Sequence, residues 1–155
     1  QARRDHAFPA ADTRPTVVVT AKSVDFAAAE SKALKGGAVV TVPETRWARC
    51  DIKTVSLLPN VLAKQAAKEA GAVEAWFVDH QGLVTEGAST NAWIVDRAGR
   101  LRTRDTQANI LRGITRATLM ELARERQIAV DERPFTVEEA KSASEAFITA
   151  ASAFV

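Results

Sequence analysis

The chain has 155 residues, of which 46% are hydrophobic and 26% charged, and it carries a net charge of +2. These fractions are close to globular averages, so they exclude wholesale disorder and fibrous repeats, and the length suits one domain or one domain with a fragment of another. No apolar run reaches the roughly 18 residues that a membrane span needs, and the basic residues are too dispersed to predict a nucleic-acid groove.

The first forty residues combine polar stretches with two strand-like runs. Residues 1–15 are polar and punctuated by proline, and the β-branched run at 16–20 predicts a strand. Residues 21–37 are rich in small and charged side chains and end on two glycines, which is typical of a linker, with a short helix at 26–34. Residues 38–42 predict a second strand.

The middle of the chain predicts one helix and two hairpins. Residues 49–55 can be extended. Pro59 near the first turn and Gly71 after the last predict a helix at 59–70. Turn sequences join two pairs of strands, at 73–78 with 83–85 and at 92–95 with 101–103.

The last third predicts a long helix, a short capped helix and two strands. An apolar face predicts a helix at 115–126, followed by a strand at 128–133. Thr136 and Glu139 have the spacing of a capping box, and 145–149 predicts a final strand. Because strands and helices do not alternate regularly, we predict a mixed α/β fold rather than a doubly wound parallel sheet.

Lys53 is the first candidate for chemistry. On an extended strand Asp51 and Lys53 point to the same face, and a lysine amine that is partly buried becomes a better nucleophile. The alternative is an exposed pair of opposite charges on a strand surface.

Two glycine-containing stretches are the next candidates. Residues 85–91 form a small polar loop in which backbone N–H groups can approach a ligand, and Glu86 ends the preceding strand. Residues 111–116 precede the long helix, whose free N–H groups suit a phosphate. The alternatives are a plain turn and an ordinary helix start with Thr115 as N-cap.

The few histidines and the single cysteine limit other chemistry. Arg4 and His6 lie on one face of an extended segment and can grip a carboxylate, although a charged terminal tail is the alternative. His80 is the only other histidine, so we predict no metal site. Cys50 is the only cysteine, which excludes an internal disulfide and favours a reducing, cytoplasmic setting.

Several of these segments occur in an order that resembles one enzyme family. The segments are RWARCDIK at 46–53, LLPNVLAK at 57–64, TEG at 85–87 with Asn91, LRGITR at 111–116 and FITAAS at 147–152. Together they resemble the fold type IV pyridoxal-phosphate enzymes, which comprise D-amino acid and branched-chain aminotransferases and aminodeoxychorismate lyase.

The resemblance implies an architecture. The pyridoxal-phosphate-binding large domain, an α/β pseudo-barrel, would span 27–155 and be cut short at its C-terminal end. Residues 1–26 would be the end of a small N-terminal α+β domain with its linker. Gln1 is not an initiator methionine and the last residues are apolar, so we expect a piece of a longer protein.

The resemblance also implies roles for single residues. Lys53 would hold pyridoxal phosphate as a Schiff base and move the proton between substrate and cofactor. Glu86 would face the pyridine nitrogen and keep it protonated. Leu111 would pack against the ring face, and Arg46 would sit behind the ring near Lys53 or Glu86.

The cofactor phosphate would be held by two segments. The first is Gly113-Ile114-Thr115 at the helix start, and the second is Thr149-Ala150-Ala151 after the last strand. The family commonly has hydroxyl residues where Ala150 and Ala151 stand. Thr149, Ser152 or backbone N–H groups would compensate.

The Arg4/His6 pair bears on the substrate. It resembles the carboxylate trap of D-amino acid aminotransferases, which predicts transfer of an amino group from a D-alanine-type amino acid to a 2-oxo acid. The family is usually homodimeric, and we expect no nucleic-acid or membrane partner. The alternatives are a branched-chain aminotransferase, an aminodeoxychorismate lyase and a catalytically silent fragment of such an enzyme.

Overall fold

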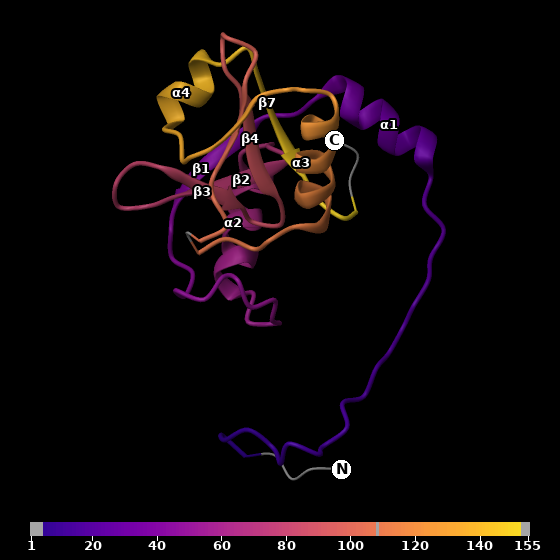
Figure 1. The fold of residues 1–155 in the computed structure, drawn as a ribbon. Coiled ribbons are helices and arrows are strands. Elements are labelled where there is room, and N and C mark those ends of the chain that lie inside the picture. Colours follow the sequence, from indigo (N-terminus) through magenta and orange to yellow (C-terminus); the bar gives the residue numbers. More distant parts are fainter. Residues whose placement is uncertain (1–4, 108, 153–155) are drawn as a thin grey trace.

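Two mixed β-sheets and their surrounding helices make up the protein in the computed structural model, which describes residues 5–107 and 109–152 (Figure 1). The first sheet has the strand order β1-β2-β3. Strand β1 (Val39–Pro43) is parallel to β2 (Glu74–Val78), and β2 is antiparallel to β3 (Val84–Gly87). The strands predicted in this part of the chain are therefore confirmed to within a few residues.

The second sheet has the order β6-β5-β4-β7. Its strands are β4 (Asn91–Val95), β5 (Leu101–Thr103), β6 (Val130–Glu132) and β7 (Glu145–Thr149). Strand β4 is antiparallel to both β5 and β7, whereas β5 and β6 are parallel. The predicted 92–95/101–103 hairpin is confirmed.

Each parallel pair is joined by a helix that crosses over the sheet. Helix α2 (Leu58–Glu69) connects β1 to β2, with proline at its first turn, and α3 (Ile114–Glu125) connects β5 to β6. A tight turn reverses the chain and so joins antiparallel strands only. Parallel neighbours need a longer crossover that brings the chain back to the same end of the sheet. Short helix α4 (Val137–Ser142) begins with the predicted capping box of Thr136 and Glu139.

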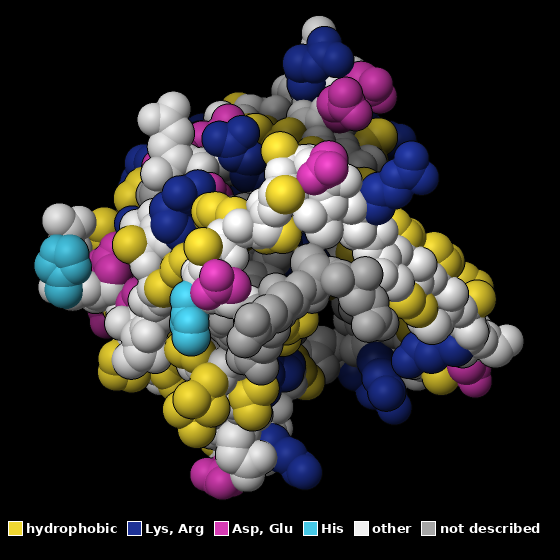
Figure 2. Space-filling view, turned by 90° about the horizontal axis from the view of Figure 1, so that it is seen from below, with side chains coloured by type: hydrophobic (Ala, Val, Ile, Leu, Met, Phe, Trp, Pro, Cys, Tyr) yellow, Lys and Arg dark blue, Asp and Glu magenta, His cyan; other side chains and the backbone are white. Residues whose placement is uncertain are grey.

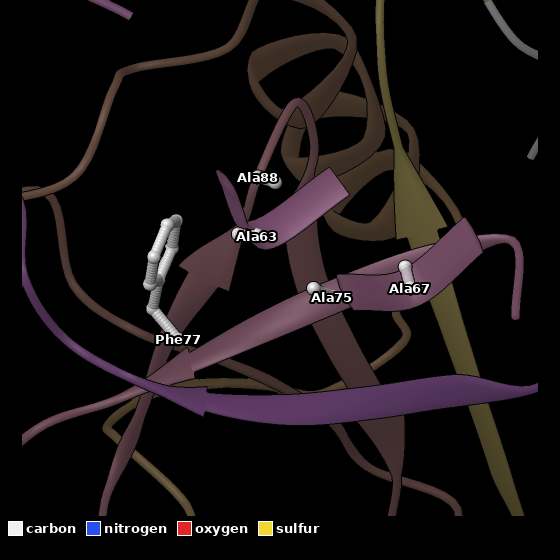
Figure 3. Close-up of a cluster of buried hydrophobic side chains, with 5 residues drawn as sticks. All are labelled: Ala63, Ala67, Ala75, Phe77 and Ala88. Carbon is white, nitrogen blue, oxygen red and sulfur yellow. The ribbon is translucent and has the colours of Figure 1, made fainter. Parts of the chain in front are cut away.

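The core beneath α2 is built from small side chains around one aromatic ring. Figure 3 shows the ring of Phe77 with alanine side chains from α2, β2 and the loop after β3. The alanines are Ala63, Ala67, Ala75 and Ala88, each at most 5% exposed. Because alanine has no side chain beyond Cβ, α2 can approach the sheet closely, and Phe77 supplies most of the buried volume.

The N-terminal segment corrects one prediction and confirms another. Residues 16–20 are not a strand: Val17, Val18 and Val19 are 78–87% exposed, and no strand among the described residues pairs with them. A β-branched run without a neighbour has no ladder to join. The segment instead lies apart from the sheets and leads to α1 (Phe26–Lys35), which matches the short helix predicted there (Figure 1).

Residues 49–55 are likewise irregular rather than extended, and α1 buries no residue. The domain boundary near residue 26 stays a prediction. The mixed α/β class is confirmed, and the described strands form two separate sheets that do not close into a barrel. No helix among the described residues has the length and hydropathy to cross a bilayer.

Exposed apolar residues lie at the start of α2. Leu58, Val61 and Leu62 are each 59–69% exposed. Figure 2 shows hydrophobic side chains in several groups on one face of the molecule, between scattered Lys and Arg side chains. The apolar surface is thus divided rather than gathered into one large patch on that face.

The packing of Phe77 generates a stability prediction. Phe77→Ala removes a side chain that is 1% exposed and leaves a cavity that the surrounding alanines cannot fill. We expect a loss of about 3–5 kcal/mol in the free energy of unfolding, measured by urea denaturation. Phe8→Ala is the control, because Phe8 is fully exposed and its loss should change little. Equal effects of the two substitutions would contradict this packing.

Candidate active site

Arg46 is a buried cation shared by two carboxylates. It lies three residues after the end of β1, and its side chain is 6% exposed. Its Nε and Nη2 donate to the two oxygens of Glu44 at 2.9 and 2.6 Å, and its Nη1 donates to Oε1 of Glu86. The guanidinium lies 4.5 Å from the centre of the Phe77 ring. The arginine was expected near Lys53 or Glu86, and the structure places it on Glu86.

Glu86 accepts hydrogen bonds from three donors. It lies near the end of β3 at 5% exposure, and besides Arg46 it accepts from Asn91 Nδ2 at 3.0 Å. The Leu111 N–H is shared between its two oxygens, at 3.2 and 3.1 Å. Because a carboxylate can accept about four hydrogens, Glu86 can bind one further N–H or O–H when the Leu111 N–H keeps to one oxygen.

The two carboxylates on Arg46 differ in basicity. Burial raises the pKa of Glu44, but hydrogen bonds and charge from Arg46 more than offset it, so this pKa lies below its ordinary value. Burial also raises the pKa of Glu86, and there Arg46 offsets only part of the effect. Glu86 is therefore the stronger base and binds a proton-bearing partner more readily.

The turn before α3 presents free backbone N–H groups. Gly113 is the N-cap and has extended backbone angles, and no side chain caps this helix end. The N-cap therefore lies two residues before Thr115, the N-cap expected for an ordinary helix start. Ile114 is 72% exposed and Thr115 is half-buried, so the first turn can be reached from outside. Its N–H groups and the positive end of the helix dipole favour an anion.

Lys53 lies on the irregular segment between β1 and α2. Its side chain is exposed, and the shared strand face predicted for Asp51 and Lys53 is wrong because no strand forms there. Asp51 instead accepts from Arg49 at 2.7 and 2.8 Å. A cleft of about 250 Å³ separates this segment from the loop before α3, lined by Arg49, Asp51, Thr106, Gln107, Asn109 and Arg112.

Thr149 ends β7 opposite Asn91 in the ladder. It is 1% exposed, and its Oγ1 accepts from Trp93 Nε1 at 3.0 Å. Ala150 and Ala151 follow as the chain turns. Asn91 also donates to the Leu111 carbonyl at 2.9 Å. Through its side chain and its position in the ladder, Asn91 therefore connects Glu86, the turn before α3 and the end of β7.

Of the two predicted substrate residues, the structure places only His6, and it is not part of this cluster. Arg4 lies outside the described residues, and His6 is exposed on the segment that lies apart from the sheets (Figure 1). Within 5–107 and 109–152, no three His, Cys, Asp or Glu side chains converge as metal ligands. Glu44 was missed, since a glutamate two residues from an arginine is common on any surface.

Comparison with known proteins identifies relatives over most of the chain. Residues 2–155 match the family model for amino-transferase class IV. The chain is 41% identical to a D-alanine aminotransferase of Staphylococcus epidermidis over 99% of its own length and 53% of the relative's. The chain therefore spans about half the length of that relative.

Solved structures show the same fold. A branched-chain aminotransferase from Thermoproteus uzoniensis with norvaline aligns with TM-score 0.67 and 31% identity, covering 76% of this chain and 41% of that one. The pyridoxal-phosphate-bound form of a hypothetical aminotransferase from Mycobacterium tuberculosis aligns with TM-score 0.68 and 25% identity, covering 74% and 44%.

Removing the Arg46 side-chain charge tests the buried cluster. Arg46→Met leaves two carboxylates without their cation, and we expect a loss of about 3–5 kcal/mol in the free energy of unfolding near neutral pH. The pKa of Glu86 is already raised above its ordinary 4.5. Its ionisation therefore lowers the free energy of unfolding as the pH rises above about 4.5. Without Arg46 the pKa rises further, and acidification should recover part of the lost stability.

Urea denaturation across a pH series measures both effects. Arg49→Met is the matched control, because Arg49 forms a solvent-exposed pair with Asp51. It should change stability little at any pH. A variant of Arg46 that is as stable as the Arg49 variant, or whose deficit grows on acidification, would contradict the buried cluster.

Proposed function

The chain belongs to the class IV aminotransferase family, and we propose that it is the pyridoxal-phosphate-binding part of an enzyme that moves an amino group from a D-alanine-type amino acid to a 2-oxo acid. The observation that carries the proposal is Glu86, a buried carboxylate with a raised pKa that accepts from three donors among the described residues. The 41% sequence identity to a D-alanine aminotransferase, over 99% of this chain, supports the same function.

The chemistry of the side chains fits pyridoxal phosphate at both of its ends. The Glu86 carboxylate suits a protonated pyridine nitrogen, and the uncapped first turn of α3 suits a phosphate. Leu111 lies between these two groups in the hydrogen-bond network, in keeping with packing on the ring face. When bound, the cofactor supplies an electron sink that stabilises negative charge on the substrate carbon.

Lys53 is the residue that would hold the cofactor covalently through its amine. Its place on an irregular segment leaves the side chain exposed and free to reorient. The same amine would then carry the proton that leaves the substrate α-carbon. Gly113, Ile114 and Thr115 would bind the phosphate, and Thr149, Ala150 and Ala151 would complete that site.

Arg46 and Glu44 would act from behind Glu86. Arg46 would keep Glu86 ionised within the core through its Nη1, and Glu44 would pair with the other side of the same guanidinium. Glu86 then remains a strong acceptor for the ring N–H. Because the negative charge of an ionised carboxylate favours the protonated form of a neighbouring base, this arrangement would keep the pyridine nitrogen protonated.

The substrate would be held by its carboxylate. Arg4 and His6 remain the proposed residues for that contact, which requires the N-terminal segment to reach the site in the whole enzyme. We also propose a cytoplasmic homodimer. A branched-chain aminotransferase is the second candidate, favoured by the 31% identity to the Thermoproteus enzyme, and a fragment without turnover is the third.

Covalent trapping tests the role of Lys53. Incubating the chain with pyridoxal phosphate and then borohydride should leave one stable pyridoxyl group on Lys53, located by peptide mass spectrometry. Lys53→Arg, which keeps the charge but cannot form the bond, should abolish the label. Labelling of Lys22 or Lys64 in place of Lys53 would sink the assignment.

A panel of amino donors tests the substrate class. The longer protein that contains this chain should use D-alanine at least about tenfold better than L-leucine, as judged by kcat/KM with 2-oxoglutarate as acceptor, because an interaction made in the transition state changes rates on that scale. Preference for L-leucine would instead support the branched-chain candidate and remove the substrate role of Arg4 and His6.

A further inference from the structure

Asn91 links the two ends of the candidate cofactor site. It is the first residue of β4 and is 4% exposed. Its Nδ2 donates to Oε2 of Glu86 at 3.0 Å and to the carbonyl oxygen of Leu111 at 2.9 Å. Both hydrogens of the amide are therefore used, one on each side.

Gly113 rests directly on the other half of the same amide. A Cβ added at Gly113 would lie 2.2 Å from Oδ1 of Asn91, a separation that real side chains do not reach. The turn that begins α3 can thus approach the amide only because residue 113 is glycine. The backbone of Asn91 is in turn fixed opposite Thr149 by the β4–β7 ladder.

We propose that Asn91 is a positioning residue that fixes the separation between the Glu86 carboxylate and the first turn of α3. A ligand with a ring nitrogen at one end and a phosphate at the other is then held at both ends at once. The inference rests on the proposed function, and it assigns a role to a residue that would not touch the cofactor.

The chemistry of an amide suits this task. An aspartate of equal size would have no hydrogen to donate, and it would place a second carboxylate about 3.0 Å from Glu86. A leucine would keep the volume but leave Glu86 and the Leu111 carbonyl each short of a partner. Only an uncharged side chain with two donors satisfies both neighbours.

The test compares three ligands that cannot form a covalent bond with lysine. Pyridoxine 5′-phosphate contacts both ends, pyridoxine offers the ring alone, and inorganic phosphate offers the anion alone. Dissociation constants are measured by amide chemical-shift titration of the chain and of Asn91→Leu. Each ligand gives a fold-loss of affinity on going from the unaltered chain to Asn91→Leu. If Asn91 sets the separation, the fold-loss for pyridoxine 5′-phosphate exceeds the product of the fold-losses for pyridoxine and phosphate by at least about tenfold.

Two further variants separate positioning from folding. Asn60→Leu is the matched control. Asn60 lies on α2, and its Nδ2 donates at 2.7 Å to the carbonyl of Ala88, in the loop between Glu86 and Asn91, and not to Glu86. It should show no excess loss. Gly113→Ala displaces the Asn91 amide from the opposite side and should reproduce the excess loss, even if Asn91→Leu fails to fold.

The outcomes separate this inference from the function on which it rests. If the unaltered chain binds neither ring-containing ligand, the proposed function fails and the inference fails with it. If it binds both, but Asn91→Leu or Gly113→Ala loses no more for pyridoxine 5′-phosphate than for the two parts combined, the positioning role alone is overturned.

Discussion

The ion pairs of one buried arginine organise the candidate active site of this molecule. Burying the charge of Arg46 is costly unless carboxylates pair with it, and Glu44 and Glu86 supply them from just after β1 and from β3. Glu86 then recruits the Leu111 N–H and the Asn91 amide. The segments that would bind a cofactor therefore owe their relative positions to one desolvated cation.

The crossover helices explain why the remaining candidates lie where they do. Lys53 precedes α2 after strand β1, and Gly113 precedes α3 after strand β5, so both lie on chain that leaves the carboxyl end of a parallel strand. In α/β proteins ligands bind beyond those ends. The alanine-rich packing of α2 against β2 keeps the first crossover close to the sheet and sets the Phe77 ring against Arg46.

Local patterns predicted much of this fold. The prolines and glycines around α2, the two hairpin turns and the Thr136–Glu139 capping box each depend on neighbouring residues, and each is found close to where it was expected. Residues 16–20 and 49–55 failed because β-propensity cannot reveal whether a partner strand exists. The part of Glu44 in the Arg46–Glu86 cluster and the two parallel pairs also escaped prediction, since contacts across about thirty to forty residues leave no local pattern.

The central claim is that Glu86, held ionised by Arg46, faces the cofactor ring nitrogen. Pyridoxal phosphate labelled with ¹⁵N at that nitrogen tests it most directly, because the ¹⁵N chemical shift of the bound ring distinguishes the protonated from the unprotonated state. We predict a protonated nitrogen near neutral pH in the unaltered chain and an unprotonated one in Glu86→Gln. An unprotonated nitrogen in the unaltered chain, or a shift that Glu86→Gln leaves unchanged, would contradict the claim.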